Sequence, residues 1–330
     1  MVTRYVNTAS TAGGDGTTND TVGANRAYAS LSGAEADLRT LNAAEDLQIM
    51  CCGTAADTTT VSFGNYTYVE AAYTVYVRSN RTVESGYHRG KWNEGAYRLQ
   101  PSSSCIFAIA NNPCNVVFDG IQAYSNLSGN QIQCTGSSSK DVILKECIVK
   151  LGSTPTCVFS NFGYSGSGIY KFRNCVCSGT NNDYDIFHYV GTVNVYNCVV
   201  RGFSNGVVRF NTGTITAKNC AVFDNSDDFY GAVTADRCAS DDGDGTNPIS
   251  VSSWSAQFLQ SDYATSLDFR LKPASVLKGK GIGPDSDVET PTTSMGSAYR
   301  FGTTTDAGPF AYSSYKAKSV FSGMSSQSGI

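Results

Sequence analysis

The side chains that could perform hydrolytic or lyase chemistry are a group of acids and one histidine in the second half of the sequence. Glycoside hydrolases need two carboxyl groups about 5 to 9.5 Å apart, one of them acting as an acid or base. A structural interpretation is equally open, because acids in Asn- and Ser-rich runs are typical of turns, and a histidine between two aromatic residues is typical of a packed position. The candidates are Asp183, Asp185, His188, Asp224 and Asp227.

Twelve cysteines form the second chemical feature of the sequence. No pair has the CxxC spacing of zinc sites and only two histidines are present, so we predict no metal site. Five cysteines recur in one setting, a polar pair followed by cysteine and small or apolar residues, at intervals of 28, 23, 22 and 18 residues. They are Cys147, Cys175, Cys198, Cys220 and Cys238. A period of this length is the signature of a solenoid.

The repeated units read as strands rather than helices. Residues 115–118, 141–144, 192–196 and 214–217 are short, rich in β-branched residues and bounded by Gly, Asn, Ser or Asp. Short strands that recur without helical crossovers stack as the coils of a parallel β-helix. We therefore predict an all-β fold, a single-stranded right-handed parallel β-helix with a short N-terminal capping helix and an irregular C-terminal cap. Gly120 is aligned with the cysteine position one coil before Cys147.

In such a solenoid the five recurring cysteines form one inward column, where a thiol behaves as a small buried hydrophobic group. Their Cβ vectors run parallel at about the strand spacing, which disfavours disulfides along the column. Asn174, Asn197 and Asn219 each precede one of these cysteines, and we expect them to form an amide ladder at the corner of the coil.

Both ends of a β-helix need covering. We predict a helix over residues 32–42, opened by a capping box of Ser32 and Glu35. The predicted divisions are an N-terminal arm and capping helix (1–46), the β-helix (47–250), and a C-terminal cap with an extended tail (251–330). Residues 81–100 are predicted as a surface loop. Residues 1–28 and 313–330 are expected to be arms that lie on other chains.

Composition excludes several partners. Charged residues make up 16% of the chain, the formal net charge is -4, and no basic cluster is present, so neither nucleic acid nor a membrane is an expected partner. The start of the sequence is polar and lacks the apolar core of a secretory signal. We expect synthesis in the cytoplasm without a signal peptide.

Segments at both ends resemble the pectin-lyase-like right-handed β-helix family, many members of which are encoded by phages. The resemblance spans about residues 4 to 312 and implies the fold rather than an activity, because this architecture hosts lyases, hydrolases, tailspikes and structural proteins. The matching segments are RYVN at 4–7, GGDGT at 13–17, ANRAYASL at 24–31, HRGKWN at 88–93, DFRLKPAS at 268–275 and DAGPFAY at 306–312.

The catalytic motifs of the family's enzymes do not transfer. Asp227-Asp228 stands without the Asn-Thr-Asp, Gly-His-Gly and Arg-Ile-Lys segments of polygalacturonase-like members. Asp183, Asp185, Asp224 and Asp236 lack the surrounding motifs of pectate-lyase-like calcium sites. Residues 241–246 resemble part of an EF-hand calcium loop but lack its distal glutamate. We therefore predict a flexible turn there. We expect no cofactor and favour a protein that is not an enzyme.

The leading hypothesis is therefore a structural virion protein, most specifically a tailed-phage capsid decoration or cement protein, with a tail fibre component as a near variant. Its expected partners are other virion proteins and further copies of itself, with a bound glycan as an open possibility, and its expected location is the virion. One alternative is a phage tailspike or polysaccharide-degrading enzyme that uses the five acid and histidine candidates. Another is a non-catalytic glycan-binding or adhesive module.

Overall fold

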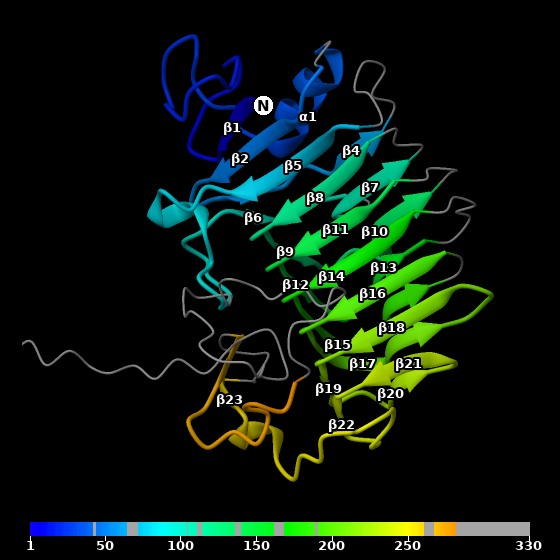
Figure 1. Ribbon diagram of the computed structural model, residues 1–330. Coiled ribbons are helices and arrows are strands. Elements are labelled where there is room, and N and C mark those ends of the chain that lie inside the picture. Colours follow the sequence, from blue (N-terminus) through cyan, green and yellow to red (C-terminus); the bar gives the residue numbers. More distant parts are fainter. Residues whose placement is uncertain are drawn as a thin grey trace, which may run out of the picture.

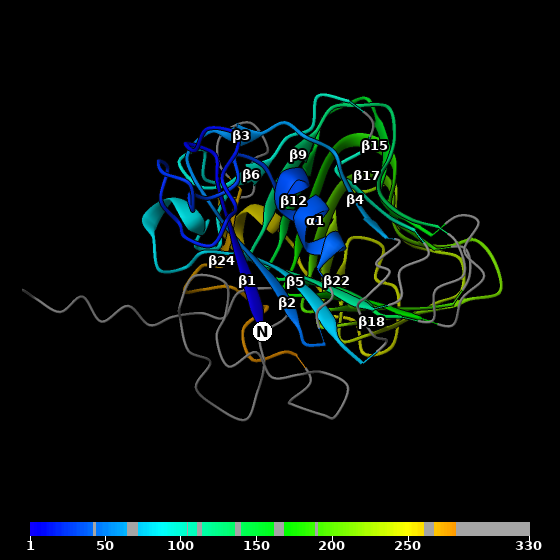
Figure 2. The same ribbon diagram turned by 90° about the horizontal axis from the view of Figure 1, so that it is seen from above.

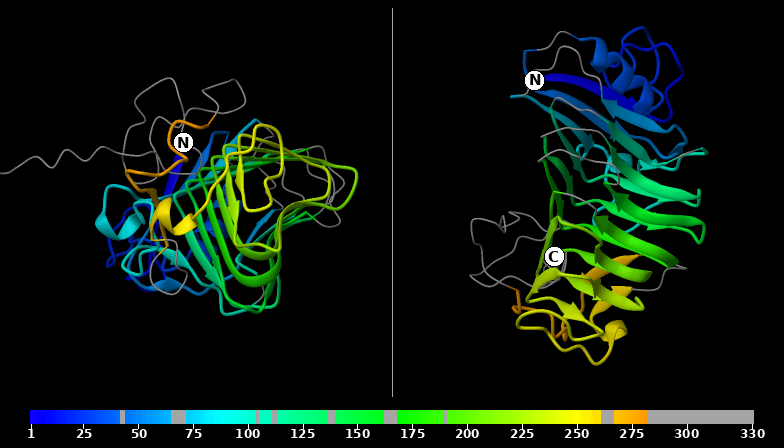
Figure 3. Two further views of the ribbon diagram at one scale, coloured as in Figure 1. Left: turned by 90° about the horizontal axis from the view of Figure 1, so that it is seen from below. Right: turned by 90° about the vertical axis from the view of Figure 1, so that its right-hand side faces the viewer.

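The short β-branched segments of the sequence form the strands of a right-handed parallel β-helix (Figure 1). The computed structural model describes residues 1–41, 44–64, 72–103, 105–110, 114–135, 140–161, 168–188, 191–260 and 267–281. In this part of the chain the strands lie in three stacks, and the complete coils pass through each stack in turn (Figure 3). The fold class predicted from the sequence is confirmed.

The first stack is a continuous parallel sheet in which side chains alternate between the interior and the outer face. Val116 and Phe118 point inward from one strand, and Val142 and Leu144 pair with them from the next coil. The strands, in spatial order, are β1 (Val2–Asn7), β2 (Leu47–Cys52), β5 (Thr74–Ser79), β8 (Asn115–Asp119), β11 (Val142–Lys145), β14 (Ile169–Arg173), β16 (Thr192–Tyr196), β18 (Thr214–Lys218) and β21 (Val233–Asp236).

The other two stacks are joined by two long strands, β15 (Val176–His188) and β17 (Val199–Arg209), which run through both. The second stack also contains β3 (Ala56–Asp57), β6 (Arg98–Leu99), β9 (Gln122–Ser125), β12 (Ile148–Leu151), β19 (Ala221–Phe223) and β22 (Ala239–Ser240). The third also contains β4 (Val61–Gly64), β7 (Phe107–Ala110), β10 (Gly129–Thr135), β13 (Pro155–Ser160) and β20 (Asp227–Tyr230).

The corner between the first and second stacks explains the repeated cysteine motif. The residue before each recurring cysteine has a positive φ, between 50° and 56°. This left-handed conformation is tolerated best by Gly and Asn, which accounts for the asparagines at Asn174, Asn197 and Asn219. Strand register pairs Asp119 with Lys145, so Gly120 occupies the position of Glu146 rather than that of Cys147. The alignment of Gly120 with the cysteines was wrong by one residue.

The N-terminal end of the β-helix is covered by α1 (Leu31–Thr40), as Figure 2 shows along the axis. Leu31, Ala34 and Leu38 on the inner face of this helix are fully buried. The predicted capping box was placed two residues too late, because Ser30 has an extended backbone and its hydroxyl accepts a hydrogen bond from the Gly33 amide. Glu35 instead pairs with Arg39 one turn later, at 2.6 Å.

The N-terminal segment is not an arm on another chain. Strand β1 pairs in parallel register with β2 over its full length, and Val6 also bridges to Tyr28. The prediction was wrong because β1 buries only Val6 completely, so its sequence lacks the alternation that usually identifies a strand. The tail 313–330 lies outside the described residues.

The C-terminal segment covers the side of the β-helix. It contains the short 3-10 helix η2 (Trp254–Ala256) and the antiparallel strands β23 (Phe258–Gln260) and β24 (Asp268–Leu271). Phe258 and Phe269 pack against the outward-facing apolar residues of the second stack, which include Val176, Val199 and Phe223. A second apolar cluster therefore lies outside the coil interior.

The predicted surface loop 81–100 is partly buried. It contains the 3-10 helix η1 (Glu84–Gly86), and its strand β6 pairs with β3 and β9. Trp92 joins the second apolar cluster, and His88 is only 1% exposed.

None of the helices in the described part of the chain has both the length and the apolar character needed to span a bilayer.

Candidate functional site

Three carboxylates meet at the C-terminal end of the β-helix. Asp227 begins β20, and Asp242 and Asp244 lie in the turn that follows β22. One oxygen of each of the three residues lies within 4.8 Å of the others. The winding of the last coil brings the turn beside β20, so residues 15 or more positions apart in the sequence share one site.

A neighbouring buried acid, Asp228, holds the residues around this site in place through hydrogen bonds. Its side chain is fully buried and accepts hydrogen bonds from the Asn225 amide at 2.8 Å, the Ser240 hydroxyl at 2.8 Å and the Asp241 backbone amide at 2.7 Å. The Asp228 backbone amide in turn donates to Asp242 at 2.8 Å. The turn predicted to be flexible is thus held to the preceding coil by hydrogen bonds on both sides.

Two acids in this region, Asp228 and Asp244, have raised pKa values. Burial raises the pKa of Asp228 to about 6, against the opposing effect of its three hydrogen-bond donors. Partial burial, followed by the negative charges of Asp242 and Asp227, raises the pKa of Asp244.

Asp227, Asp242 and Asp244 have the donor chemistry of a hard-cation site, because carboxylate oxygens are the preferred ligands of Ca²⁺ and Mg²⁺. Three acidic ligands supply half or fewer of the six to eight oxygens that Ca²⁺ takes. The cluster therefore has the composition of a partial site.

The five candidates named from the sequence lie in β15, in β20 and in the turn between β19 and β20. Asp183, Asp185 and His188 lie on the backbone of β15, so the turn expected around Asp183 is wrong, and their side chains lie outside what the structure describes. Strand β17 lies between β15 and β20, which places Asp227 two strands from Tyr184, or roughly 9 to 10 Å at the usual strand spacing. Asp224 turns to Arg201, with which it forms an ion pair at 3.0 Å.

A second cluster of ionisable groups lies beside the middle coils, where the 81–100 segment meets the ends of β8 and β11. Arg81 Nη2 contacts Asp119 at 2.6 Å and Glu146 at 3.0 Å, and the Tyr87 hydroxyl donates to the same Glu146 oxygen at 3.0 Å. Burial raises the pKa of Glu146, although Arg81 opposes the shift. Since Glu146 is only 1% exposed, this cluster fastens the 81–100 segment to the coils and offers no access to a polymer.

His88 belongs to the same anchor. Its Nδ1 accepts a hydrogen bond from the Gly90 amide at 3.0 Å, which leaves Nε2 to donate to the Glu146 carbonyl oxygen at 2.9 Å. Burial lowers the pKa of His88 to about 3. The imidazole is therefore held neutral, with a structural role.

The five recurring cysteines lie one above another at the first corner, each no more than 2% exposed. Their thiols donate to nearby backbone carbonyls, as Cys198 does to Tyr196 at 3.2 Å. All twelve cysteines are buried and free of disulfides. The asparagine ladder is present between Asn219 and Asn197, whose amides are joined at 3.2 Å.

The proximity of Asp227 to Asp242 and Asp244 was missed in the sequence because Asp227 lies one coil before the turn that carries the other two acids. The dense run of acids at 241–244 was the one local signal of this carboxylate cluster. The distance between that run and Asp227 depends on the shortened last coil. The cluster around Arg81 had no local signal, since Asp119 and Glu146 lie on successive coils.

Comparison with known proteins adds one structural likeness. No protein-family model matches the chain. A search of curated proteins also found no match. The crystal structure of pectate lyase Pel9A is similar with a TM-score of 0.49 and 14% sequence identity, over 95% of this chain and 97% of that one.

Proposed function

We propose that this chain is a non-catalytic structural protein of a virion, a capsid decoration protein of a tailed phage, with a tail fibre component as the near variant. The observation that carries the proposal is the use of acidic residues as fasteners. Asp228, Asp224 and Asp241 are all engaged in contacts that join the last coils to one another and to the C-terminal segment.

These contacts favour a mechanical role. Asp241 accepts hydrogen bonds from the Asp224 backbone amide and from the Trp254 indole, which begins the segment that covers the side of the β-helix. An acid that serves as a cross-link is less available to exchange protons with a substrate. A β-helix whose last coil and side are covered by the C-terminal segment of the same chain is suited to bind a particle as a rigid unit. The resemblance to phage-encoded β-helix proteins supports the same role.

The proposal is tested on phage capsids and tails that lack the protein. Purified protein added back should bind at a fixed stoichiometry, visible as regular added density by electron microscopy. The same protein should leave host polysaccharide, pectate and polygalacturonate intact with or without Ca²⁺. Failure to bind particles, together with turnover of any polymer, contradicts the proposal.

A second candidate function is degradation of a polysaccharide, favoured by the contact of Asp227 with Asp242 and Asp244 and by the raised pKa of Asp228. A cation at these carboxylates and a protonated acid nearby are elements that such enzymes use. The discriminating variants are Asp227→Asn and Asp242→Asn, compared with Asp20→Asn, a substitution of an acid near the N-terminus. Polymer turnover that both site variants abolish and the control retains would establish the enzyme.

A further inference from the structure

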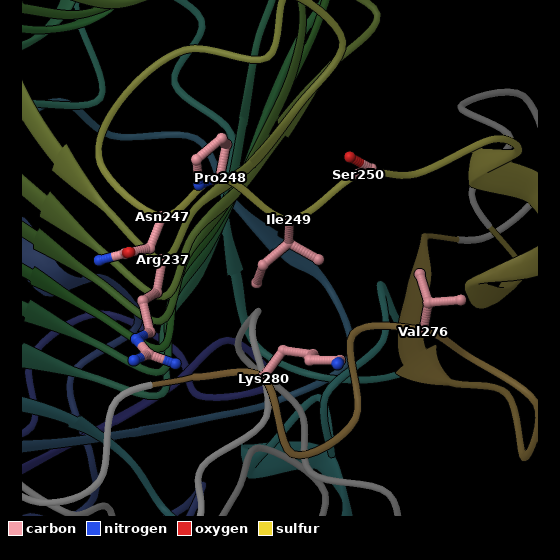
Figure 4. Close-up of a pocket in the computed structure, with 7 residues that line it drawn as sticks. All are labelled: Arg237, Asn247, Pro248, Ile249, Ser250, Val276 and Lys280. Carbon is pink, nitrogen blue, oxygen red and sulfur yellow. The ribbon is translucent and has the colours of Figure 1, made fainter.

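A pocket of about 460 Å³ lies under the last coil, between that coil and the C-terminal segment (Figure 4). One wall comes from Arg237 and residues 247–250, and the other from Val276 and Lys280. Figure 4 shows the Ile249 side chain pointing toward Lys280, with Arg237 on one flank and Val276 on the other. The size falls within the range of small-molecule sites, about 300 to 1,000 Å³.

The backbone on both sides of this pocket is fixed by hydrogen bonds. The Arg237 amide donates to Thr246 at 3.0 Å, and the Ile249 amide donates to Cys238 at 2.9 Å. On the other side, the Val276 amide donates at 2.8 Å to the side chain of Gln257, which is buried. The pocket is therefore formed before a ligand arrives, which lowers the entropic cost of binding.

The pocket is lined by two cations, Arg237 and Lys280. Within the described part of the chain, neither the Arg237 guanidinium nor the Lys280 ammonium forms an ion pair or hydrogen bond. Several other arginines differ, since Arg4 and Arg201, for example, are each held by a carboxylate. Asp236 is the acid next to Arg237 in sequence, and its carboxylate accepts a hydrogen bond from Asn247 at 3.2 Å.

We propose that this pocket binds a phosphate monoester of a sugar or small polyol. A carboxylate has two oxygens, which the fork of one arginine can satisfy alone. A phosphate monoester has three acceptor oxygens and a charge of about -1.5 to -2, so it can accept hydrogen bonds from Arg237 of the last coil and attract a second cation as well. Figure 4 shows the exposed Lys280 side chain extending away from Arg237, and rotation of this side chain would bring its ammonium to the same phosphate. The apolar side chains of Ile249 and Val276 cover the carbon skeleton, and the side chains of Asn247 and Ser250 supply polar contacts to hydroxyl groups.

The experiment is isothermal titration calorimetry of the full chain with glucose 6-phosphate and with sn-glycerol 3-phosphate at low and moderate salt. Glucose, glucuronate and inorganic phosphate are the comparison ligands. We expect saturable binding of both esters that weakens with salt, because the two cations are exposed. Glucose should not bind, and glucuronate and inorganic phosphate should bind at least several-fold more weakly than the esters.

Arg237→Gln and Lys280→Gln should each weaken ester binding by about 10-fold, the order expected for one charge-assisted hydrogen bond. The matched control is Arg89→Gln, which removes an exposed positive charge elsewhere and should change affinity less than 2-fold. Circular dichroism should show unchanged folding in all three variants. Absence of saturable ester binding, equal binding of glucuronate, equal binding of inorganic phosphate, or insensitivity to both pocket substitutions would each overturn the proposal.

Discussion

The backbone amide of Trp92 donates a hydrogen bond of 3.1 Å to the carbonyl oxygen of Leu267, tying an early insertion to the C-terminal segment. An antiparallel bridge between Lys91 and Asp268 lies beside it. Together with the buried Trp92 ring, these contacts close the C-terminal segment over the outer face of the second stack. Two parts of the sequence that frame most of the coils are thereby joined directly.

The first prediction concerns the stability that this cover provides. Phe269 is fully buried in the second apolar cluster, so Phe269→Ala should lower the free energy of unfolding by about 3 to 5 kcal/mol. Leu259 lies nearby but is 45% exposed, and Leu259→Ala should change stability by less than about 1 kcal/mol. Urea denaturation measures both. Equal losses would show that the cover does not stabilise the coils.

The second prediction concerns the pH dependence set by Asp228. Its folded-state pKa, about 6, lies above the ordinary 3.8, so the folded chain binds the proton more tightly than the unfolded chain does. This contribution to stability is present below pH 3.8 and is lost as the pH rises through 6. The difference in unfolding free energy between the wild type and Asp228→Asn should fall by on the order of 2 to 3 kcal/mol from pH 4 to pH 7. Parallel pH profiles for the two proteins would contradict the raised pKa.

His88 should have the opposite effect. Its pKa is lowered to about 3, so the unfolded chain binds the proton more tightly, and stability is lost as the pH falls below about 6.5. Between pH 7 and pH 4 the advantage of the wild type over His88→Gln should shrink by on the order of 3 kcal/mol. A nitrogen-detected NMR titration should show His88 neutral, with the proton on Nε2, down to pH 4. An imidazole that titrates near pH 6.5 would disprove the assignment.

The cysteine column should be chemically silent in the folded protein. None of the five side chains is more than 2% exposed, which keeps reagents away from them, and burial also raises the pKa of the Cys147, Cys198 and Cys238 thiols. Thiol reagents should label all five recurring cysteines slowly in native protein and rapidly in guanidinium. Fast labelling of these positions in native protein, or disulfides among them detected by mass spectrometry, would contradict the inward cysteine column.

Substitutions at Cys198 test the column from within. Cys198→Asp places a carboxylate in the core and should cost several kcal/mol, or leave the acid protonated by raising its pKa. Cys198→Ala keeps the position apolar and should be far milder, which thermal unfolding can measure. Equal effects of the two substitutions would place the side chain outside the core.

The repeat itself made the coils predictable from sequence. Strands at 115–118, 192–196 and 214–217 are confirmed because β-branched runs and corner residues recur together, so each coil supports the alignment of the next. The predicted N-cap was wrong because Ser30 and Ser32 have the same side chain, and only the extended backbone of Ser30 identifies it as the cap. Strand β1 was not predicted because its conformation depends on pairing with β2 rather than on an apolar pattern of its own.

Contacts between distant segments account for what was missed at the sites. The acids Asp227 and Asp242 meet only because the last coil is shortened, and the pocket at Arg237 and Lys280 depends on the return of the C-terminal segment. Neither relationship has a spacing that a repeat would reveal. Local sequence patterns therefore identified the scaffold better than the functional surfaces built at its end.

The side cover also imposes an order on biosynthesis. The ribosome completes the coils that carry Ile148, Val176 and Val199 before it makes Phe258 and Phe269, so these outward apolar residues stay unprotected on the nascent chain until translation has passed residue 277. During that interval the growing rod exposes a row of hydrophobic side chains that favours association with other nascent chains or with chaperones. A message truncated before this segment would yield coils without their cover, and the resulting fragment would be prone to aggregation.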